Sequence, residues 1–333
     1  MKSRDYEELK ILVTGGLGFI GSNFIFHVME KYSKCQVNNL DAEFPGSNKK
    51  NVKEIGNKKN YRYFKGNINN KKLVEKLIKN CDVVFNFAAE SHVDRSIDNP
   101  KPFFDSNIMG TYSILEAIRK FDKKLIHIST DEVFGSLKTG SATEKYPFNP
   151  SSPYAASKAS AELLVNSYAI TYGSDVVITR CTNNYGPRQF PEKLIPKTIL
   201  LAMNNKPIPI YGDGKNKRDW IFVLDHCQAI LKVFEGGKKG ESYNIAGNNE
   251  IDNNEVVKMI LYVMGKPKSL IKHVSDRPGH DFRYSLNTTK IQKELGWKPK
   301  YRFQEGLDST VKWYLDNRSW WQKIPKESMG RTK

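Results

Sequence analysis

The chain has 333 residues and a formal net charge of +17, from 53 lysines and arginines against 36 aspartates and glutamates. It contains no apolar stretch near the ~20 residues of a membrane span, and its first ten residues lack the apolar segment of a signal peptide. The four cysteines lie far apart without a C-x-x-C pair, which excludes a disulfide scaffold or a structural zinc site. We therefore expect a cytoplasmic protein of roughly two domains.

The positive charge is spread along the chain. Lysines are scattered among asparagines, as in SNKKNVKEIGNKKN, and no arginine-rich arm or aromatic-basic pattern typical of RNA recognition is present. We interpret the charge mainly as a composition bias, with a contribution to binding anionic ligands as the alternative. We expect neither a nucleic-acid partner nor a membrane partner.

Apolar runs alternate with helix-period segments over the first half of the chain. The runs are KILVTGG, CQVNNLD, YRYFKGNI, DVVFNFAA, KLIHIST and DVVITRCTN, and the helical segments are clearest at 69–80, 99–120 and 154–172. Near-continuous apolar runs indicate strands covered on both faces. The alternation therefore predicts an α/β fold with a Rossmann-type, doubly wound parallel sheet.

After about residue 183 the pattern changes. Prolines cluster, short strands such as PIPIYG and YNIAG appear, and helical segments follow near 225–236, 253–264 and 305–319. We expect residues 1–183 to form a dinucleotide-binding domain, which roughly residues 219–248 rejoin. Residues 184–333 are expected to form mainly a smaller, interleaved α/β substrate domain, with a disordered tail at 325–333.

A glycine-rich turn follows the first predicted strand. The segment Thr14–Gly21 fits both G-x-G-x-x-G and G-x-x-G-x-x-G and opens a helix, as a turn that receives a dinucleotide diphosphate does. Asp41 ends the second strand twenty residues after Gly21, where a carboxylate accepts hydrogen bonds from ribose hydroxyls and favours NAD over NADP. Asn67 stands where an aspartate often contacts the adenine amino group, and its side-chain carbonyl is also an acceptor.

Tyr154 and Lys158 form a Y-x-x-x-K pair on a predicted helix, where i and i+4 share one face. A free phenol with a pKa of ~10 is a poor base at neutral pH. A nearby lysine and the positive nicotinamide ring would favour the phenolate. Alone, the pair is better explained as a coincidence on a solvated helix face.

A polar run, Ser129-Thr130-Asp131-Glu132, closes the strand KLIHIST. In a doubly wound sheet the carboxyl ends of the strands face the ligand crevice. Adjacent acids at such a place also occur as a solvated turn or a helix cap. Combined with the glycine turn and the Y-x-x-x-K pair, they indicate a catalytic site.

With these motifs the chain resembles the nucleoside-diphosphate-glucose 4,6-dehydratases of the extended short-chain dehydrogenase/reductase superfamily, over nearly its whole length. The resemblance is carried by TGGLGFIGS, NFAAESHVDRSI, ISTDEVFG, SPYAASKA, NNYGPRQFPEKLIP, RDWIFVLDH, YNIAGNNE and DRPGHDFRY. The Thr-Asp-Glu triplet is its specific element, since sister epimerases usually lack the acid pair. Phe134, Asn67 and the segment AEFPGSN after Asp41 depart from the usual family text.

The resemblance implies an NAD-dependent lyase that dehydrates dTDP-glucose or UDP-glucose to a 4-keto-6-deoxy sugar, a step toward rhamnose or other deoxysugars. It implies Tyr154 as base at the 4-hydroxyl, Thr130 as hydrogen-bond partner of the same oxygen, and Lys158 as the group that tunes Tyr154. Glu132 would take the C5 proton, and Asp131 would protonate the departing 6-hydroxyl.

The resemblance also implies ligand contacts and a homodimer formed by helices near 99–120 and 154–172. No metal ligands are expected. The implied NAD-binding residues are Gly15, Gly18, Phe19, Ile20, Gly21, Asp41, Asn67, Ile68, Ala88, Ala89, Ser106, Tyr154, Lys158 and Asn184. The implied substrate-binding residues are Ser91, Thr130, Asn183, Lys193, Leu194, Pro209, Ile210, Tyr211, Arg218, Asn253, Asp276, Arg277, Pro278, Gly279 and His280.

Three alternatives stay open. A 4-epimerase on the same scaffold would use the same cofactor without Asp131 and Glu132. A non-catalytic NAD- or RNA-binding protein would need none of the catalytic side chains. The base of the nucleotide is also open, because thymine and uracil differ by one methyl group, worth ~1 kcal/mol in a pocket.

Overall fold

The structure, a computed structural model, describes residues 8–322 and 324, so the tail predicted at 325–333 lies outside the described residues. Its centre is a seven-stranded sheet in the order β10-β6-β5-β4-β1-β2-β3, and all of its strand pairs are parallel. These strands are β1 (Lys10–Thr14), β2 (Gln36–Asp41), β3 (Tyr61–Lys65), β4 (Val83–Asn86), β5 (Lys124–Thr130), β6 (Val176–Cys181) and β10 (Ser242–Ile245). The predicted Rossmann-type sheet is confirmed.

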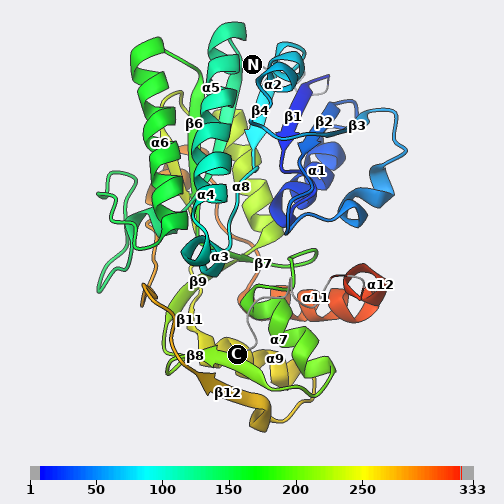
Figure 1. Cartoon of the computed structure of the whole chain (residues 1–333), viewed down its shortest axis with the longest axis vertical. Coiled ribbons are helices and arrows are strands. Elements are labelled where there is room, and N and C mark those ends of the chain that lie inside the picture. The colour runs from blue at the N-terminus through cyan, green and yellow to red at the C-terminus, as the bar shows by residue number, and fades with distance from the viewer. Residues whose placement is uncertain (1–7, 323, 325–333) are drawn as a thin grey trace.

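Helices cover both faces of this sheet (Figure 1). Ile11 and Val13 of β1 belong to the apolar core with α1 (Phe19–Lys31), α8 (Val223–Gly236) and α10 (Thr289–Leu295). Leu12 belongs to the opposite core with α2 (Lys71–Lys79), α5 (Gly110–Phe121) and α6 (Pro153–Tyr172). Because successive side chains of a strand point to opposite faces, burial on both faces explains the near-continuous apolar runs.

The helix predicted over 99–120 contains an irregular turn. It comprises α4 (Lys101–Phe103), a π-helical stretch at Phe104–Met109 and then α5. A π-helical turn inserts an extra residue into the helix and often lies at functional sites. Here the turn includes Ser106, which lines the cavity described below, and the buried Asn107.

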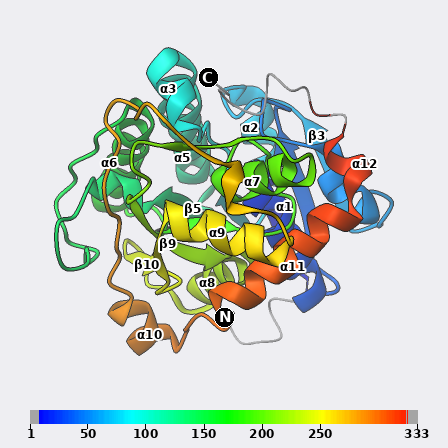
Figure 2. The same cartoon turned by 90° about the horizontal axis from the view of Figure 1, so that it is seen from below.

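Two smaller sheets and four helices make up the smaller part of the molecule (Figures 1 and 2). The sheets are β11-β9-β7 and β12-β8, built from β7 (Asn183–Tyr185), β8 (Ile208–Tyr211), β9 (Lys217–Phe222), β11 (Glu250–Asp252) and β12 (Ile271–Val274). The helices are α7 (Leu194–Met203), α9 (Asn253–Val263), α11 (Phe303–Asp316) and α12 (Arg318–Trp321). Helices α7, α9 and α11 share a third apolar core with β9.

The chain crosses between the two parts more than once. Strand β10 pairs with β6 in the large sheet, and α8 packs against α1, although both follow residue 183. The division into domains at about residue 183 stays a prediction. Short helical segments complete the fold: η2 (Lys49–Ile55), α3 (Val93–Asp98), η4 (Asp131–Phe134) and η5 (Lys268–Leu270). Across the described residues, no helix combines the length and the apolarity that crossing a membrane requires.

Candidate active site

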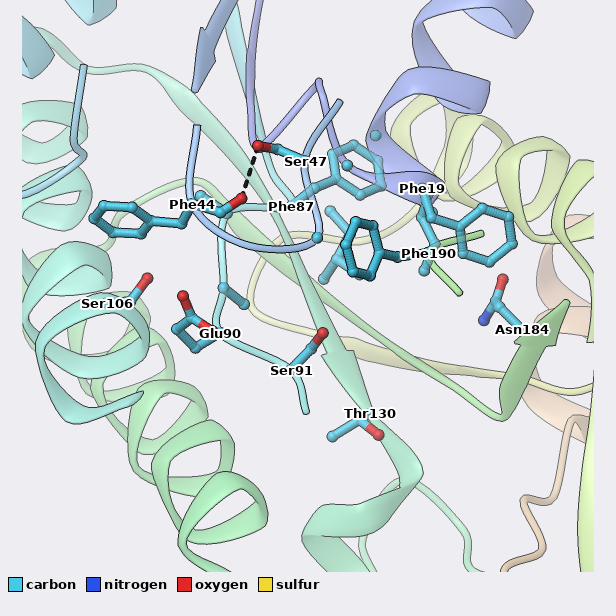
Figure 3. A pocket seen from close by; sticks show the side chains of 18 of the residues that line it. Phe19, Phe44, Ser47, Phe87, Glu90, Ser91, Ser106, Thr130, Asn184 and Phe190 are labelled. Atoms are coloured by element: carbon cyan, nitrogen blue, oxygen red, sulfur yellow. Dashed lines mark hydrogen bonds between the residues drawn. The ribbon is translucent and has the colours of Figure 1, made fainter. Parts of the chain in front are cut away.

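A cavity of about 300 Å³ lies at the carboxyl ends of the large sheet's strands. It is lined by the β1–α1 turn, by the segments after β2, β3, β4 and β5, and by the start of α6 (Figure 3). All of the predicted NAD-binding residues and all five predicted catalytic residues line it. The residues predicted to bind NAD and the residues predicted to be catalytic therefore line the same cavity.

The glycine turn brings the backbone of β1 and α1 unusually close to the end of β4. Gly15 has φ +72°, and a Cβ on it would lie 2.7 Å from the backbone nitrogen of Ala88. Helix α1 begins after Gly18, and no side chain caps that end. The first-turn N–H groups of α1 are therefore left for a ligand, as a dinucleotide diphosphate requires.

Asp41 is held by backbone groups on both sides of the cavity's rim. Its Oδ2 accepts a hydrogen bond from the Leu17 N–H at 2.9 Å, and its Oδ1 accepts one from the Glu43 N–H at 2.8 Å. Burial raises the pKa of Asp41. Glu43, at φ +61°, accepts a 2.7 Å hydrogen bond from the Tyr63 hydroxyl. The fixed Asp41 carboxyl group in the cavity lining suits a ribose with free hydroxyls, and its charge together with that of the nearby Glu43 opposes a 2′-phosphate.

The loop that follows Asp41 forms part of the cavity wall, which the sequence did not predict. Phe44 is half-exposed there, and its carbonyl accepts a hydrogen bond from the Ser47 hydroxyl at 2.8 Å (Figure 3). The sequence feature that pointed to this loop was that AEFPGSN differs from the sequence usual in the family. Asn67, predicted to meet the adenine, lines the cavity and uses Oδ1 to accept the Asn69 N–H at 2.8 Å.

Lys158 and Tyr154 project from α6 into the same space. The Lys158 ammonium donates a 2.7 Å hydrogen bond to the Ile128 carbonyl, and burial lowers the pKa of Lys158 to about 8. Burial and then the Glu132 carboxyl raise the pKa of Tyr154 well above its usual value, while the hydrogen bond with Thr130 acts in the opposite direction. These surroundings disfavour the phenolate, so the predicted phenolate requires the positive charge of bound NAD⁺ in addition to that of Lys158.

The acid pair begins η4 directly after β5. Asp131 is buried, and its Oδ2 has no hydrogen-bond partner among the described residues. Burial, followed by the neighbouring Glu132, raises the pKa of Asp131 well above its usual value. Burial also raises the pKa of Glu132, but Arg277 and Lys193 oppose this rise. The two carboxyl groups are therefore unequal, with Asp131 suited to hold a proton and Glu132 to accept one.

The predicted substrate residues are brought together only in part. Ser91, Thr130, Asn183 and Lys193 line the cavity, whereas the remainder lie outside its lining: Leu194, Pro209, Ile210, Tyr211, Arg218, Asn253, Asp276, Arg277, Pro278, Gly279 and His280. The Lys193 ammonium donates to the Ser91 carbonyl at 2.9 Å.

Arg218 and Arg277, which lie outside the cavity lining, form hydrogen bonds within the protein. Arg218 is buried and donates to the carbonyls of Asp281 at 2.9 Å and Lys217 at 2.8 Å. Arg277 donates to Asp94 at 3.1 Å.

Asn107 is a buried residue that sequence reasoning missed. Its side-chain amide accepts the Glu90 N–H at 2.9 Å and donates to the Glu90 carbonyl at 3.0 Å. It also donates to the Ser157 hydroxyl at 2.8 Å. This amide joins the wall after β4 to the catalytic helix α6. No sequence signal pointed to it, because its inward position depends on the π-helical turn.

Comparison with known proteins decides the family. The sequence profile of the GDP-mannose 4,6-dehydratase family matches residues 12–310. A dTDP-glucose 4,6-dehydratase of Streptomyces niveus is 46% identical over 97% of this chain and 98% of its own length. The Escherichia coli enzyme of the same name is 42% identical over 95% of this chain and 96% of its own. The chain belongs to the dTDP-glucose 4,6-dehydratase family.

Solved structures of this family have the same fold. The dTDP-glucose 4,6-dehydratase of Bacillus anthracis, in complex with NAD, has a TM-score of 0.89 and 48% identity over 94% of this chain and 99% of its own. A UDP-glucose 4-epimerase of Thermotoga maritima is nearly as similar in fold, with a TM-score of 0.86, but is 28% identical over 92% of this chain and 99% of its own. Fold alone therefore does not separate dehydratase from epimerase, and the higher identity to the dehydratases does.

Proposed function

We propose that this chain removes water from dTDP-glucose and forms dTDP-4-keto-6-deoxyglucose, with NAD restored in every turnover. The observation that carries the proposal is the position of two unequal carboxyl groups, the buried Asp131 and the half-buried Glu132, with Tyr154 in one cavity. The 41–48% identity of this chain to dTDP-glucose 4,6-dehydratases supports thymidine as the nucleoside.

Direct elimination from glucose is not feasible, because the C5 hydrogen is far too weakly acidic for a side chain to remove. A carbonyl at C4 makes this hydrogen acidic, since the resulting carbanion is then an enolate. Bound NAD supplies the hydride acceptor for C4 and later the hydride for C6, so the overall reaction is redox-neutral. The cradle at Gly15, the uncapped start of α1 and the rim carboxyl of Asp41 fit this cofactor.

Tyr154 takes the proton of the 4-hydroxyl while that carbon is oxidised. The Thr130 hydroxyl, hydrogen-bonded with the phenol, is placed to orient the same oxygen. The Lys158 ammonium, fixed on the Ile128 carbonyl, stabilises the phenolate and is placed to hold the nicotinamide ribose. Ile68, Ala88, Ala89, Ser106 and the other predicted NAD-binding residues complete the cofactor's side of the cavity.

The elimination then uses the acid pair. Glu132 removes the C5 proton, and the C5–C6 bond becomes a double bond as the C6–O bond breaks. Asp131 gives its proton to the departing hydroxyl, which leaves as water. Glu132 returns a proton to C5 when C6 is reduced. The neutral Asp131 and the ionised Glu132 required at the start match the unequal pKa shifts of these groups.

The proposal also assigns substrate contacts to individual residues. Ser91, Asn183 and Lys193 line the cavity and would meet the sugar and the diphosphate there. Arg218 and Arg277 are proposed as further diphosphate cations, since a guanidinium pairs well with phosphate oxygens. The nucleoside would be enclosed by the remaining predicted residues: Leu194, Pro209, Ile210, Tyr211, Asn253, Asp276, Pro278, Gly279 and His280.

The same proposal includes a homodimer. Helices α5 and α6 lie side by side on one flank of the large sheet (Figure 1). Large apolar side chains are exposed on both helices and on the π-helical turn that precedes α5. These are Phe104, Met109, Tyr112, Leu163, Ile170 and Tyr172. Light scattering should give twice the chain mass, and Leu163→Glu with Ile170→Glu should give a monomer; a wild-type monomer at micromolar concentration would refute the dimer.

The four cysteines are buried thiols, as expected for a reducing compartment, and a cytoplasmic location stays a prediction. The decisive test of function incubates the protein and NAD with dTDP-glucose or UDP-glucose and measures a product lighter by one water. We expect faster dehydration of dTDP-glucose. Formation of the galactose epimer alone would support an epimerase, and salt-dependent RNA binding without turnover would support a non-catalytic protein.

A further inference from the structure

Asp94 connects two segments of the smaller part of the molecule to the large-sheet part. It lies in α3, which follows the β4 end of the cavity wall, and α3 borders the junction between the two parts (Figure 1). Asp94 Oδ1 accepts a hydrogen bond from Arg277 Nη1 at 3.1 Å, and Asp94 Oδ2 accepts one from the Tyr211 hydroxyl at 3.1 Å. Both partners are predicted substrate residues.

The two partners come from neighbouring strands. Tyr211 ends β8 and is paired with Val274 of β12, and Arg277 follows three residues after Val274. A single carboxylate thus holds the polar tips of two side chains, one at the end of β8 and one in the segment that follows β12. Substrate that binds to both would find them already ordered, which reduces the conformational entropy lost on binding.

The Asp94–Arg277 contact is largely shielded from water. The side chain of Asp94 is 18% exposed and that of Arg277 is 21% exposed. Burial alone would raise the pKa of Asp94, but Arg277 and then His92 outweigh it and hold the pKa below its usual value. Arg277 Nε is buried and has no hydrogen-bond partner among the described residues. The guanidinium therefore retains a buried donor that an anionic ligand could satisfy.

We propose that Asp94 is a positioning residue that orients Tyr211 and Arg277 to receive the nucleoside diphosphate of the substrate. It acts through these two side chains and takes no part at the reacting carbons. The proposal rests on the proposed function, because the substrate roles of Tyr211 and Arg277 belong to it.

Two effects of Asp94 oppose each other, and the experiment separates them. Its negative charge repels a diphosphate, whereas its two hydrogen bonds order the groups that bind the diphosphate. Asp94→Asn removes the charge and one of the two acceptor oxygens while keeping the size of the side chain. If repulsion dominated, this variant would bind dTDP more tightly; if ordering dominates, it binds dTDP more weakly.

The test measures dTDP binding by calorimetry in the NAD-loaded wild type, Asp94→Asn, Tyr211→Phe and the double variant. We expect Asp94→Asn to raise the Kd for dTDP about tenfold, as the loss of a charged hydrogen bond does. The KM for dTDP-glucose should rise similarly, with kcat changed less than about twofold. The effects of the two substitutions should be clearly less than additive, because the oxygen that Asp94→Asn retains should stay with the charged Arg277, so that both substitutions remove the Tyr211 contact.

Asp316→Asn is the control, since Asp316 forms an exposed ion pair with Lys312 at 3.7 Å and lies in α11. It should leave the Kd and KM unchanged. An unchanged or lower Kd in Asp94→Asn, or strict additivity with Tyr211→Phe, would overturn the positioning role. A wild type that cannot dehydrate dTDP-glucose would instead refute the proposed function, so the two failures are distinguishable.

Discussion

The Lys158 ammonium donates a 2.7 Å hydrogen bond to the backbone carbonyl of Ile128. This bond ties the catalytic helix α6 to strand β5, two residues before Thr130. The base Tyr154 and the acid pair that follows Thr130 are thereby held on one rigid frame. The two chemical steps, oxidation at C4 and elimination across C5–C6, can share one bound sugar because their side chains are fixed relative to each other.

Lys158 is expected to act through charge as well as through this hydrogen bond. Lys158→Met keeps an apolar stem of similar length but removes the positive charge and the hydrogen bond to the Ile128 carbonyl. The pKa of Tyr154 should therefore rise further. We expect kcat to fall at least about 10²-fold, the lower range for loss of acid–base assistance. Steady-state kinetics with dTDP-glucose at neutral pH measures this. A variant with wild-type kcat at neutral pH would exclude the assigned role.

The pH profile of kcat should be a bell set by the acid pair. Burial raises the pKa of Glu132, so the base form is lost as the pH falls through a value above that of an ordinary glutamate. At higher pH, activity falls as Asp131 loses the proton that it must donate. The limbs report the coupled pair rather than either residue alone.

Arg277 provides an internal check on the acid limb. Its guanidinium is the main group that opposes the raised pKa of Glu132, so Arg277→Gln should shift the acid limb of kcat to higher pH at saturating substrate. An acid limb at the pKa of a free glutamate, ~4.3, would contradict a raised pKa of Glu132. An acid limb at the same pH in the wild type and in Arg277→Gln would contradict the effect of Arg277 on that pKa.

Gly15→Ala should destroy the cofactor cradle. The substitution combines φ +72° with a Cβ placed 2.7 Å from the backbone nitrogen of Ala88, so the end of β4 must move. Gly265 is the matched control, because it has φ +61° and nothing within 4 Å of its added Cβ. Both variants lose about 1–2 kcal/mol from the left-handed backbone. Calorimetric NAD binding should be lost in Gly15→Ala and retained in Gly265→Ala, and equal NAD affinities would contradict the cradle.

The buried ion pair between Arg180 and Glu162 should stabilise the fold and take no part in the reaction. Arg180 and Glu162 are 3% and 0% exposed, and their closest contact is 2.7 Å. Glu162→Ala leaves a buried guanidinium without its counter-charge, so urea unfolding should show a loss of about 3–5 kcal/mol. The exposed-pair variant Asp316→Asn should change the free energy of unfolding by less than about 0.5 kcal/mol. An equal loss of unfolding free energy in the two variants would contradict the expectation that the buried ion pair contributes more to stability than the exposed one.

The sequence predicts the large sheet and the cofactor side of the cavity well, for a physical reason. Parallel strands end at the same edge, so residues at the ends of their apolar runs, such as Asp41 and Thr130, must lie together. The pairing of Asp94 with Arg277 could not be predicted, because it joins residues 183 positions apart across two parts of the fold. Asn107 was missed because a regular helix would not have turned its side chain inward.

The most direct test of the central claim follows each half of the elimination in Asp131→Asn, Glu132→Gln and the double variant. In deuterated water, mass spectrometry of the recovered sugar separates uptake of deuterium at C5 from loss of water. We predict that Glu132→Gln abolishes both, whereas Asp131→Asn retains deuterium uptake and loses water at least about 10²-fold more slowly. Product formation at the wild-type rate by the double variant would contradict the account.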